Sequence, residues 1–166
     1  MALRPRPKRS AGILVYRLQG ASLDVLLVHP GGPFWIKKDA GAWFIPKGEI
    51  NPEEEPLAAA YREFHEELGL AAPPGAPLEL GTVKNKGGKL IYAWALPGDL
   101  DLTAFRSNTF ELEWPPRSGK KAEFPEVDRA RYFTFEEALS MMHPAELPLV
   151  ERLLQLLLPE RAPVSL

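Results

Sequence analysis

Three glutamates crowd one short stretch of the chain. Glu63, Glu66 and Glu67 lie within REFHEELGL, which spans residues 62–70. On an α-helix, with about 100° between successive residues, their carboxylates fall on one patch. Like charges at this spacing repel one another and weaken a helix. A divalent cation would remove that repulsion, and Mg²⁺ and Mn²⁺ prefer carboxylate and water ligands. The pattern indicates either a metal site or a solvated acidic helix face.

The helix that carries these glutamates needs a buried face on its other side. Leu57, Tyr61, Phe64 and Leu68 recur at helical spacing and form one apolar stripe. Gly69 follows the last periodic residue, which predicts that the helix ends there. The glutamates are therefore expected to project from the face turned away from the core.

The composition describes an ordinary globular domain. The chain has 166 residues, of which 45% are hydrophobic and 25% charged. It has no cysteine, which excludes a disulfide framework, a zinc–thiolate site and a thiol nucleophile. No apolar run approaches the roughly 20 residues of a membrane span, and a net charge of −2 argues against a dedicated nucleic-acid binder. We expect a cytoplasmic protein with a small-molecule partner and no nucleic-acid or membrane partner.

Strand and helix patterns alternate along the chain, which predicts a mixed α/β fold. We expect a basic tail over residues 1–9, one domain over 10–158 and a proline-bearing tail over 159–166. Strands are expected at 11–18, 23–30, 42–48 (stopping at Pro46), 78–98 (two strands around a turn), 108–116 and 131–135. Loops are expected at 31–41 and 117–130, and two further helices at 136–142 and 148–158.

The glutamate cluster belongs to a longer pattern. Gly48 is followed by five residues, Glu54, seven residues, and then the run from Arg62 to Leu70. This spacing matches the signature G-x5-E-x7-R-E-U-x-E-E-x-G-U of the Nudix hydrolases, in which U is aliphatic or bulky and apolar. Phe64 is a mild departure from the usual aliphatic residue. The chain therefore resembles the Nudix family over these 23 residues, and in the order of its elements from 10 to 158.

The resemblance implies a fold and an activity. The fold would be a three-layer α/β/α sandwich with a central mixed sheet, and the motif would form a loop–helix–loop. The activity would be that of a metal-dependent pyrophosphohydrolase, in which water attacks a phosphorus of a nucleoside diphosphate linked to another moiety. Mg²⁺, or Mn²⁺ in its place, would hold the pyrophosphate and neutralise its charge.

The motif also implies which residues hold the metal. By position, Glu63 and Glu67 are ligands, and Glu66 is either a ligand or the catalytic group that helps to deprotonate water. The Gly48 carbonyl is implied as a further ligand. A glycine at this point would let the backbone turn sharply and approach the metal closely.

Two other motif residues are implied to support catalysis. Glu54 would support the site and Arg62 would orient a glutamate, although Arg62 would also serve as a plain surface partner of Glu66. A further base or ligand often comes from outside the motif, and Glu123 and Glu126 are candidates that would otherwise be solvated loop carboxylates.

Two residues outside the signature are expected to bind the substrate. Lys47 stands in a Pro-Lys-Gly triplet that resembles the diadenosine polyphosphate and diphosphoinositol polyphosphate branches. It would hold a phosphate as a point charge, or be a plain surface lysine. Trp35 lies among lysines in an expected loop, where it would stack on a planar group, whereas most other tryptophans are expected in the core.

Two rival interpretations remain. The chain would be a non-catalytic Nudix-fold module that binds a nucleotide or a protein, or the acidic helix would be purely structural. Relatives that only bind usually lack motif glutamates, and here all are present. The leucines of the last helix leave open whether the chain is a monomer or a homodimer.

Overall fold

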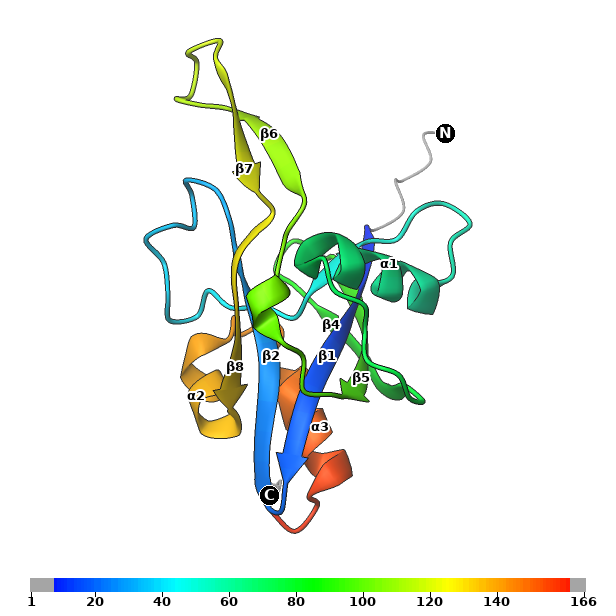
Figure 1. Cartoon of the computed structure of the whole chain (residues 1–166). Coiled ribbons are helices and arrows are strands. Elements are labelled where there is room, and N and C mark those ends of the chain that lie inside the picture. Colours follow the sequence, from blue (N-terminus) through cyan, green and yellow to red (C-terminus); the bar gives the residue numbers. More distant parts are fainter. Residues whose placement is uncertain (1–7, 162–166) are drawn as a thin grey trace.

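The computed structural model describes residues 8–161. Its strands are β1 (Arg9–Gln19), β2 (Ser22–Pro30), β3 (Lys47–Glu49), β4 (Leu78–Lys84), β5 (Leu90–Pro97), β6 (Thr109–Glu113), β7 (Lys121–Pro125) and β8 (Val127–Thr134). Its helices are α1 (Pro56–Leu68), α2 (Phe135–Met141) and α3 (Leu147–Leu157), with a short 3₁₀ turn η1 at Leu102–Ala104 (Figure 1). Among the described residues, no helix is both long and apolar enough to cross a membrane. Most of the two expected tails, residues 1–7 and 162–166, lies outside the described residues.

The main sheet has the strand order β4-β5-β1-β2-β8, and β3 also pairs with β1. β1 runs parallel to β5 but antiparallel to β2 and β3, so the sheet is mixed, as expected. β1 occupies the centre because its run of apolar residues can be buried on both faces.

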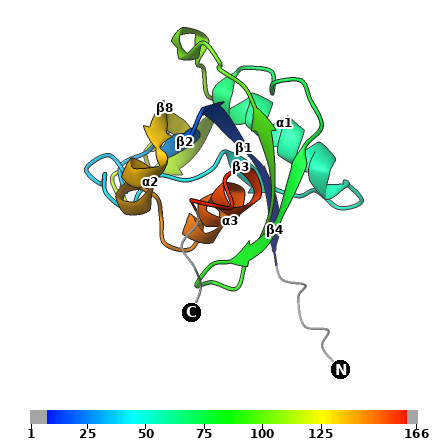
Figure 2. The same ribbon diagram turned by 90° about the horizontal axis from the view of Figure 1, so that it is seen from below.

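Helices cover both faces of this sheet. Ala11, Ile13 and Val15 of β1 belong to the core cluster that includes α1. Leu14 and Tyr16 point the opposite way, as alternate residues of a strand do, and join the cluster that includes α2 and α3. Figure 2 shows α1 and α3 on opposite sides of the sheet. The expected α/β/α sandwich is therefore confirmed.

The segment 42–48 does break at Pro46, as expected, but no regular strand precedes the break and one follows it at Lys47–Glu49. Phe44 makes only an isolated bridge, exchanging backbone hydrogen bonds of 2.8 and 2.9 Å with Val28. The regular strand begins at Lys47 and pairs with β1 rather than β2. Pro46 stands between the two pairings and has no N–H with which to continue a ladder.

The loop expected over residues 117–130 is wrong from Lys121 onward, because β7 begins there and β8 follows from Val127. β6 and β7 form a two-stranded sheet of their own, which extends away from the main sheet (Figure 1). Phe110 pairs with Phe124 across this hairpin. Phe34, from the loop between β2 and β3, meets Trp114 edge to face at 5.6 Å between ring centroids. The hairpin thus packs beside the loop that carries Trp35.

Candidate metal centre and adjoining pocket

The buried face of α1 fixes the direction of its glutamates. Phe64 and Leu68 are completely buried. Gly69 follows with φ of 66°, and its N–H donates to the His65 carbonyl at 2.7 Å. This left-handed conformation suits glycine and ends the helix where the sequence predicted. The three glutamates of the motif therefore lie on the partly exposed side of α1.

Gly48 lies in β3 directly against one of these glutamates. A Cβ atom at position 48 would sit 1.9 to 2.4 Å from the carboxylate atoms of Glu63. Gly48 pairs with Ala11 of β1, and its backbone φ angle is not positive. The sharp turn expected at this glycine is therefore absent, and glycine is required because the Glu63 carboxylate approaches the backbone closely.

Three carboxylates converge at this point. Glu63, Glu67 and Glu126 each offer an oxygen, and these oxygens all lie within 4.8 Å of one another. Glu126 connects β7 to β8, and its backbone is held on both sides. Its N–H donates to the Asn108 carbonyl at 2.8 Å, and its carbonyl accepts from the Gly31 N–H at 3.0 Å.

The carboxylates of this group resist ionising together. Burial raises the pKa of Glu67 to about 8, and the charges of Glu63 and Glu126 act in the same direction. The Lys47 charge and its backbone N–H, which donates to Glu67 Oε2 at 3.1 Å, act against the rise. Burial also raises the pKa of Glu63 and that of Glu126. A nearby cation would relieve both the burial and the repulsion.

The donor atoms fit a hard divalent cation. The group offers only oxygen atoms, which suits Mg²⁺ or Mn²⁺. The missing side chain at Gly48 provides the space in which Glu63 reaches the group. We therefore find the residues present compatible with the divalent metal that the motif implies.

Arg62 organises the carboxylates beside this group. Its Nε and Nη2 donate to the two oxygens of Glu54, each at 2.9 Å. Its Nη1 donates to Glu63 at 2.8 Å and to Glu66 at 3.2 Å, and Nη2 also reaches the Glu49 carbonyl at 2.9 Å. The hydrogen bonds from Arg62 are the main reason that the pKa of Glu54 falls to about 2. Arg62 is thus not merely a surface partner of Glu66.

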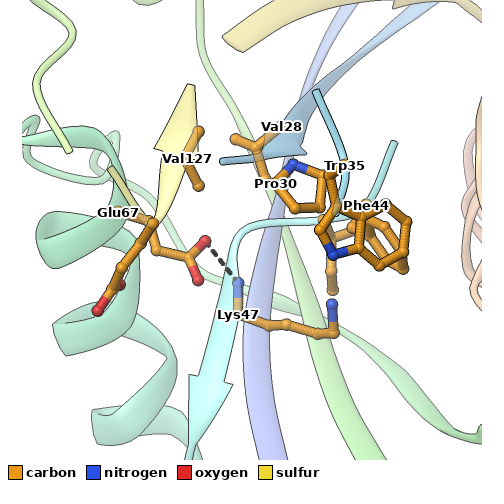
Figure 3. A pocket seen from close by; sticks show the side chains of 9 residues that line it. Val28, Pro30, Trp35, Phe44, Lys47, Glu67 and Val127 are labelled. Carbon is orange, nitrogen blue, oxygen red and sulfur yellow. Dashed lines mark hydrogen bonds between the residues drawn. The ribbon is translucent and has the colours of Figure 1, made fainter. Parts of the chain in front are cut away.

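A pocket of about 270 Å³ opens next to the carboxylates. Glu67 and Glu126 lie along its lining. Figure 3 shows Glu67 opposite the side that carries Trp35, Phe44 and Lys47. Trp35 meets Phe44 edge to face, with 5.5 Å between ring centroids. The Lys47 amine lies 4.5 Å from the centroid of Phe44. The pocket therefore combines acidic, aromatic and cationic surfaces.

Lys47 is held by a residue far away in the sequence. Glu146, only 1% exposed, accepts from the Lys47 amine at 2.6 Å. The other Glu146 oxygen accepts from the Ile45 N–H at 2.9 Å. The Lys47 side chain is 18% exposed, so it differs from a plain surface lysine.

The structure brings most of the residues predicted from the sequence close together, but not all of the glutamates join the three-carboxylate group. Glu66 bonds Arg62 and lies outside the three-carboxylate group. Glu123 lies on β7, where it accepts from the Thr109 hydroxyl, and it also lies outside that group. Glu126 was only one of two candidates from its segment. The alternation of KAEFP before it could have identified the strand that precedes Glu126, although not the place to which that strand leads.

Comparison with known proteins identifies relatives. A family model described as NUDIX domain matches residues 6–153. The RNA pyrophosphohydrolase of Cellvibrio japonicus is 46% identical over 48 residues, which is 28% of this chain and 28% of that protein. The RNA pyrophosphohydrolase of Pseudomonas putida is 39% identical over 51 residues, 30% of this chain and 32% of that protein. The chain thus matches less than a third of the length of these curated relatives.

Solved structures match over most of the chain. An Ap4A hydrolase from C. elegans, in a binary complex, has a TM-score of 0.64 and 20% identity, covering 89% of this chain and 97% of that one. The NUDIX domain of Shewanella oneidensis NrtR, complexed with ADP ribose, has a TM-score of 0.64 and 16% identity. The match covers 93% of this chain and 90% of that one. At these identities the likeness concerns the fold.

Proposed function

Because the chain belongs to the Nudix family, whose model matches residues 6–153, we propose that it is a metal-dependent pyrophosphohydrolase. Its substrate is a nucleoside diphosphate linked to another moiety, and the reaction breaks a phosphoanhydride bond. The observation that carries this proposal is the convergence of Glu63, Glu67 and Glu126 beside a pocket that also contains Lys47.

The acidic residues bind the cation that this chemistry requires. Glu63, Glu67 and Glu126, with the Gly48 carbonyl, are the proposed ligands. A bound divalent cation neutralises phosphate charge and lowers the pKa of a water that it holds. Glu66 is proposed as a further ligand or as the acceptor of a proton from the attacking water.

Arg62 and Glu54 act through the carboxylates rather than on the substrate. Arg62 holds one oxygen of Glu63 and one of Glu66, so it fixes the direction in which each presents its other oxygen. Glu54 occupies two N–H groups of the guanidinium and prevents it from rotating away. Cleavage of a phosphoanhydride depends mostly on positioning and charge neutralisation, which gives this network its role.

The pocket supplies the contacts to the rest of the substrate. Lys47 would bind a phosphate oxygen as a point charge, and Trp35 and Phe44 offer aromatic surface to a base. A dinucleoside polyphosphate or a nucleoside triphosphate fits this combination, and the fold is shared with an Ap4A hydrolase. A cytoplasmic location and a small-molecule substrate remain predictions from the sequence.

A substrate panel tests the proposal. Diadenosine tetraphosphate, a nucleoside triphosphate, ADP-ribose and a 5′-triphosphorylated RNA would be incubated with the protein and Mg²⁺. We expect turnover of at least one compound and a loss of at least about tenfold in Glu67→Gln, since even groups that only support a metal ligand have effects of about 10- to 100-fold. Glu111→Gln, an exposed glutamate of β6, is the matched control.

Two outcomes would contradict the proposal. One is the absence of turnover for every compound, beside an active control enzyme. The other is tight binding, measured by calorimetry with Mg²⁺, of a ligand that is recovered intact. The second result would support the rival interpretation, a Nudix-fold module that binds without cleaving.

A further inference from the structure

A second pocket adjoins the first. It measures about 360 Å³ and shares Trp35, Phe44 and Lys47 with the first pocket. Its other lining comes partly from the turn between β4 and β5, including Lys86 and Lys89. The first pocket is acidic where Glu67 and Glu126 line it, whereas the second contains three lysines and one carboxylate, Glu146, which pairs with Lys47.

Two of these lysines lack a carboxylate partner. Across residues 8–161, no carboxylate oxygen lies within 4.0 Å of the amine of Lys86 or of Lys89, whereas Lys47 has Glu146. Lys89 is nevertheless half-buried. Burial, followed by the charge of Lys47, lowers the pKa of the Lys89 amine. A partly buried cation without a partner is unfavourable, and an anion in the pocket would compensate it.

The turn holds Lys89 in a defined position. The Asn85 side chain accepts from the Lys89 N–H at 2.9 Å, and the Asn85 N–H donates to the Lys89 carbonyl at 3.0 Å. Gly88 allows this closure with φ of 84°. The lysine thus projects from a fixed backbone, which reduces the conformational entropy lost when it binds an anion.

We propose that the second pocket receives the phosphates of a polyphosphate chain that lie beyond the cleaved bond, and that Lys86 and Lys89 bind them. Lys47, which lines both pockets, marks the boundary between the acidic and the basic compartment. The site then favours substrates with long polyphosphate chains, such as a dinucleoside tetraphosphate, over diphosphates such as ADP-ribose. This inference rests on the proposed function and names the substrate class for the same site.

The hairpin offers a matched control for Lys89. Lys84 pairs with Leu90 across β4 and β5, so both side chains lie on one face. Lys89 precedes β5 and lines the second pocket. Lys84 is exposed and does not line either pocket. Lys84→Gln therefore removes the same charge from the same hairpin without touching the proposed site.

Binding is measured by calorimetry with Mg²⁺ present. The probes are a dinucleoside tetraphosphate and a nucleoside diphosphate whose anhydride oxygens are replaced by methylene groups, so that neither is cleaved. We expect Lys89→Gln and Lys86→Gln each to weaken binding of the tetraphosphate analogue by about tenfold, as expected for loss of one charged hydrogen bond. Binding of the diphosphate analogue should change by less than about twofold, and Lys84→Gln should leave both affinities unchanged.

The inference is overturned if Lys89→Gln weakens both analogues equally, or if Lys84→Gln has the same effect as Lys89→Gln. It is also overturned if the wild-type protein binds the two analogues with equal affinity. Turnover of the natural tetraphosphate is measured separately. Its absence would count against the proposed function, whereas the analogue affinities decide the role of the two lysines. Melting temperatures of the variants check that folding is intact.

Discussion

The carboxylate of Glu63 lies where a side chain on Gly48 would have to be. A Cβ atom at that position would come within 1.9 Å of the carboxylate carbon, far closer than two such atoms can approach. The strand β3 and the helix α1 therefore meet at a point where residue 48 must be glycine for Glu63 to reach Glu67 and Glu126.

Gly48→Ala is expected to displace Glu63 and disable the site. The added methyl would push the carboxylate away from Glu67 and Glu126, so Mg²⁺-dependent kcat/KM should fall by about 10- to 100-fold. Overpacking of this kind also destabilises, by roughly 1–3 kcal/mol. Gly87→Ala is a control for stability alone, because a Cβ atom there would meet nothing closer than 3.5 Å but Gly87 lines the second pocket. Wild-type kinetics in Gly48→Ala would contradict the role of this contact.

The two candidate bases from the β7 segment should behave differently. Glu126 lies in the three-carboxylate group, whereas Glu123 bonds Thr109 on the hairpin. Glu126→Gln is expected to lower Mg²⁺-dependent turnover by at least about tenfold, and Glu123→Gln to leave it within about twofold. Steady-state kinetics over a range of Mg²⁺ concentrations measure both. If the two variants lower turnover equally, a position in the three-carboxylate group does not determine the contribution of a glutamate to turnover.

The contrast between these two glutamates shows what local sequence reasoning can reach. The motif glutamates share one helix, so the 3.6-residue period and a terminal glycine were enough to place them on a common face. Glu126 comes from a segment whose charged residues resemble a loop. It reaches the site only because β8 pairs with β2, with Val127 opposite Pro30. No pattern within the segment specifies that pairing.

The ion-pair partner of Lys47 is a second contact that local sequence patterns could not predict. Lys47 and Glu146 are 99 positions apart, and neither neighbouring sequence indicates the other. The fold class, by contrast, followed from the order of strands and helices, because each element carries its own period. What sequence reasoning missed were long-range contacts, such as the isolated bridge of Phe44 to Val28, that form only when separate elements are packed together.

The raised pKa of Glu67 predicts how stability depends on pH. A carboxyl whose pKa is higher in the folded state binds its proton more tightly when folded. Ionisation of Glu67 therefore removes stability from the metal-free protein as pH rises from about 4.5 to about 8. The melting temperature of the metal-free protein, measured across this range, should fall more steeply for the wild type than for Glu67→Gln.

Mg²⁺ should reverse this loss. The cation binds the ionised carboxylate, so it must displace a proton at pH 6 but much less so at pH 8.5. Millimolar Mg²⁺ is therefore expected to raise the melting temperature more at pH 8.5 than at pH 6. Glu67→Gln should abolish most of this difference. If Mg²⁺ leaves the melting temperature unchanged at both pH values, a purely structural role for the acidic helix would be supported.

The ion pair of Lys47 with Glu146 should matter differently for stability and for activity. Glu146→Gln keeps an oxygen for the Ile45 N–H but removes the charge opposite Lys47. Loss of one partner of a buried pair leaves the other charge uncompensated, so we expect a loss of roughly 3 kcal/mol in the free energy of unfolding. Urea denaturation measures this change.

The double variant Lys47→Met/Glu146→Gln separates the two roles. With both charges removed, no unpaired charge remains in the buried site, so much of the stability lost in Glu146→Gln should return. Activity should be low in the double variant, because Lys47 is proposed to bind a phosphate of the substrate and Met carries no charge. KM for a polyphosphate substrate is therefore expected to stay raised by about tenfold. A double variant with wild-type KM would mean that Lys47 serves the fold alone, and one as unstable as Glu146→Gln would mean that the Glu146 charge stabilises something other than Lys47.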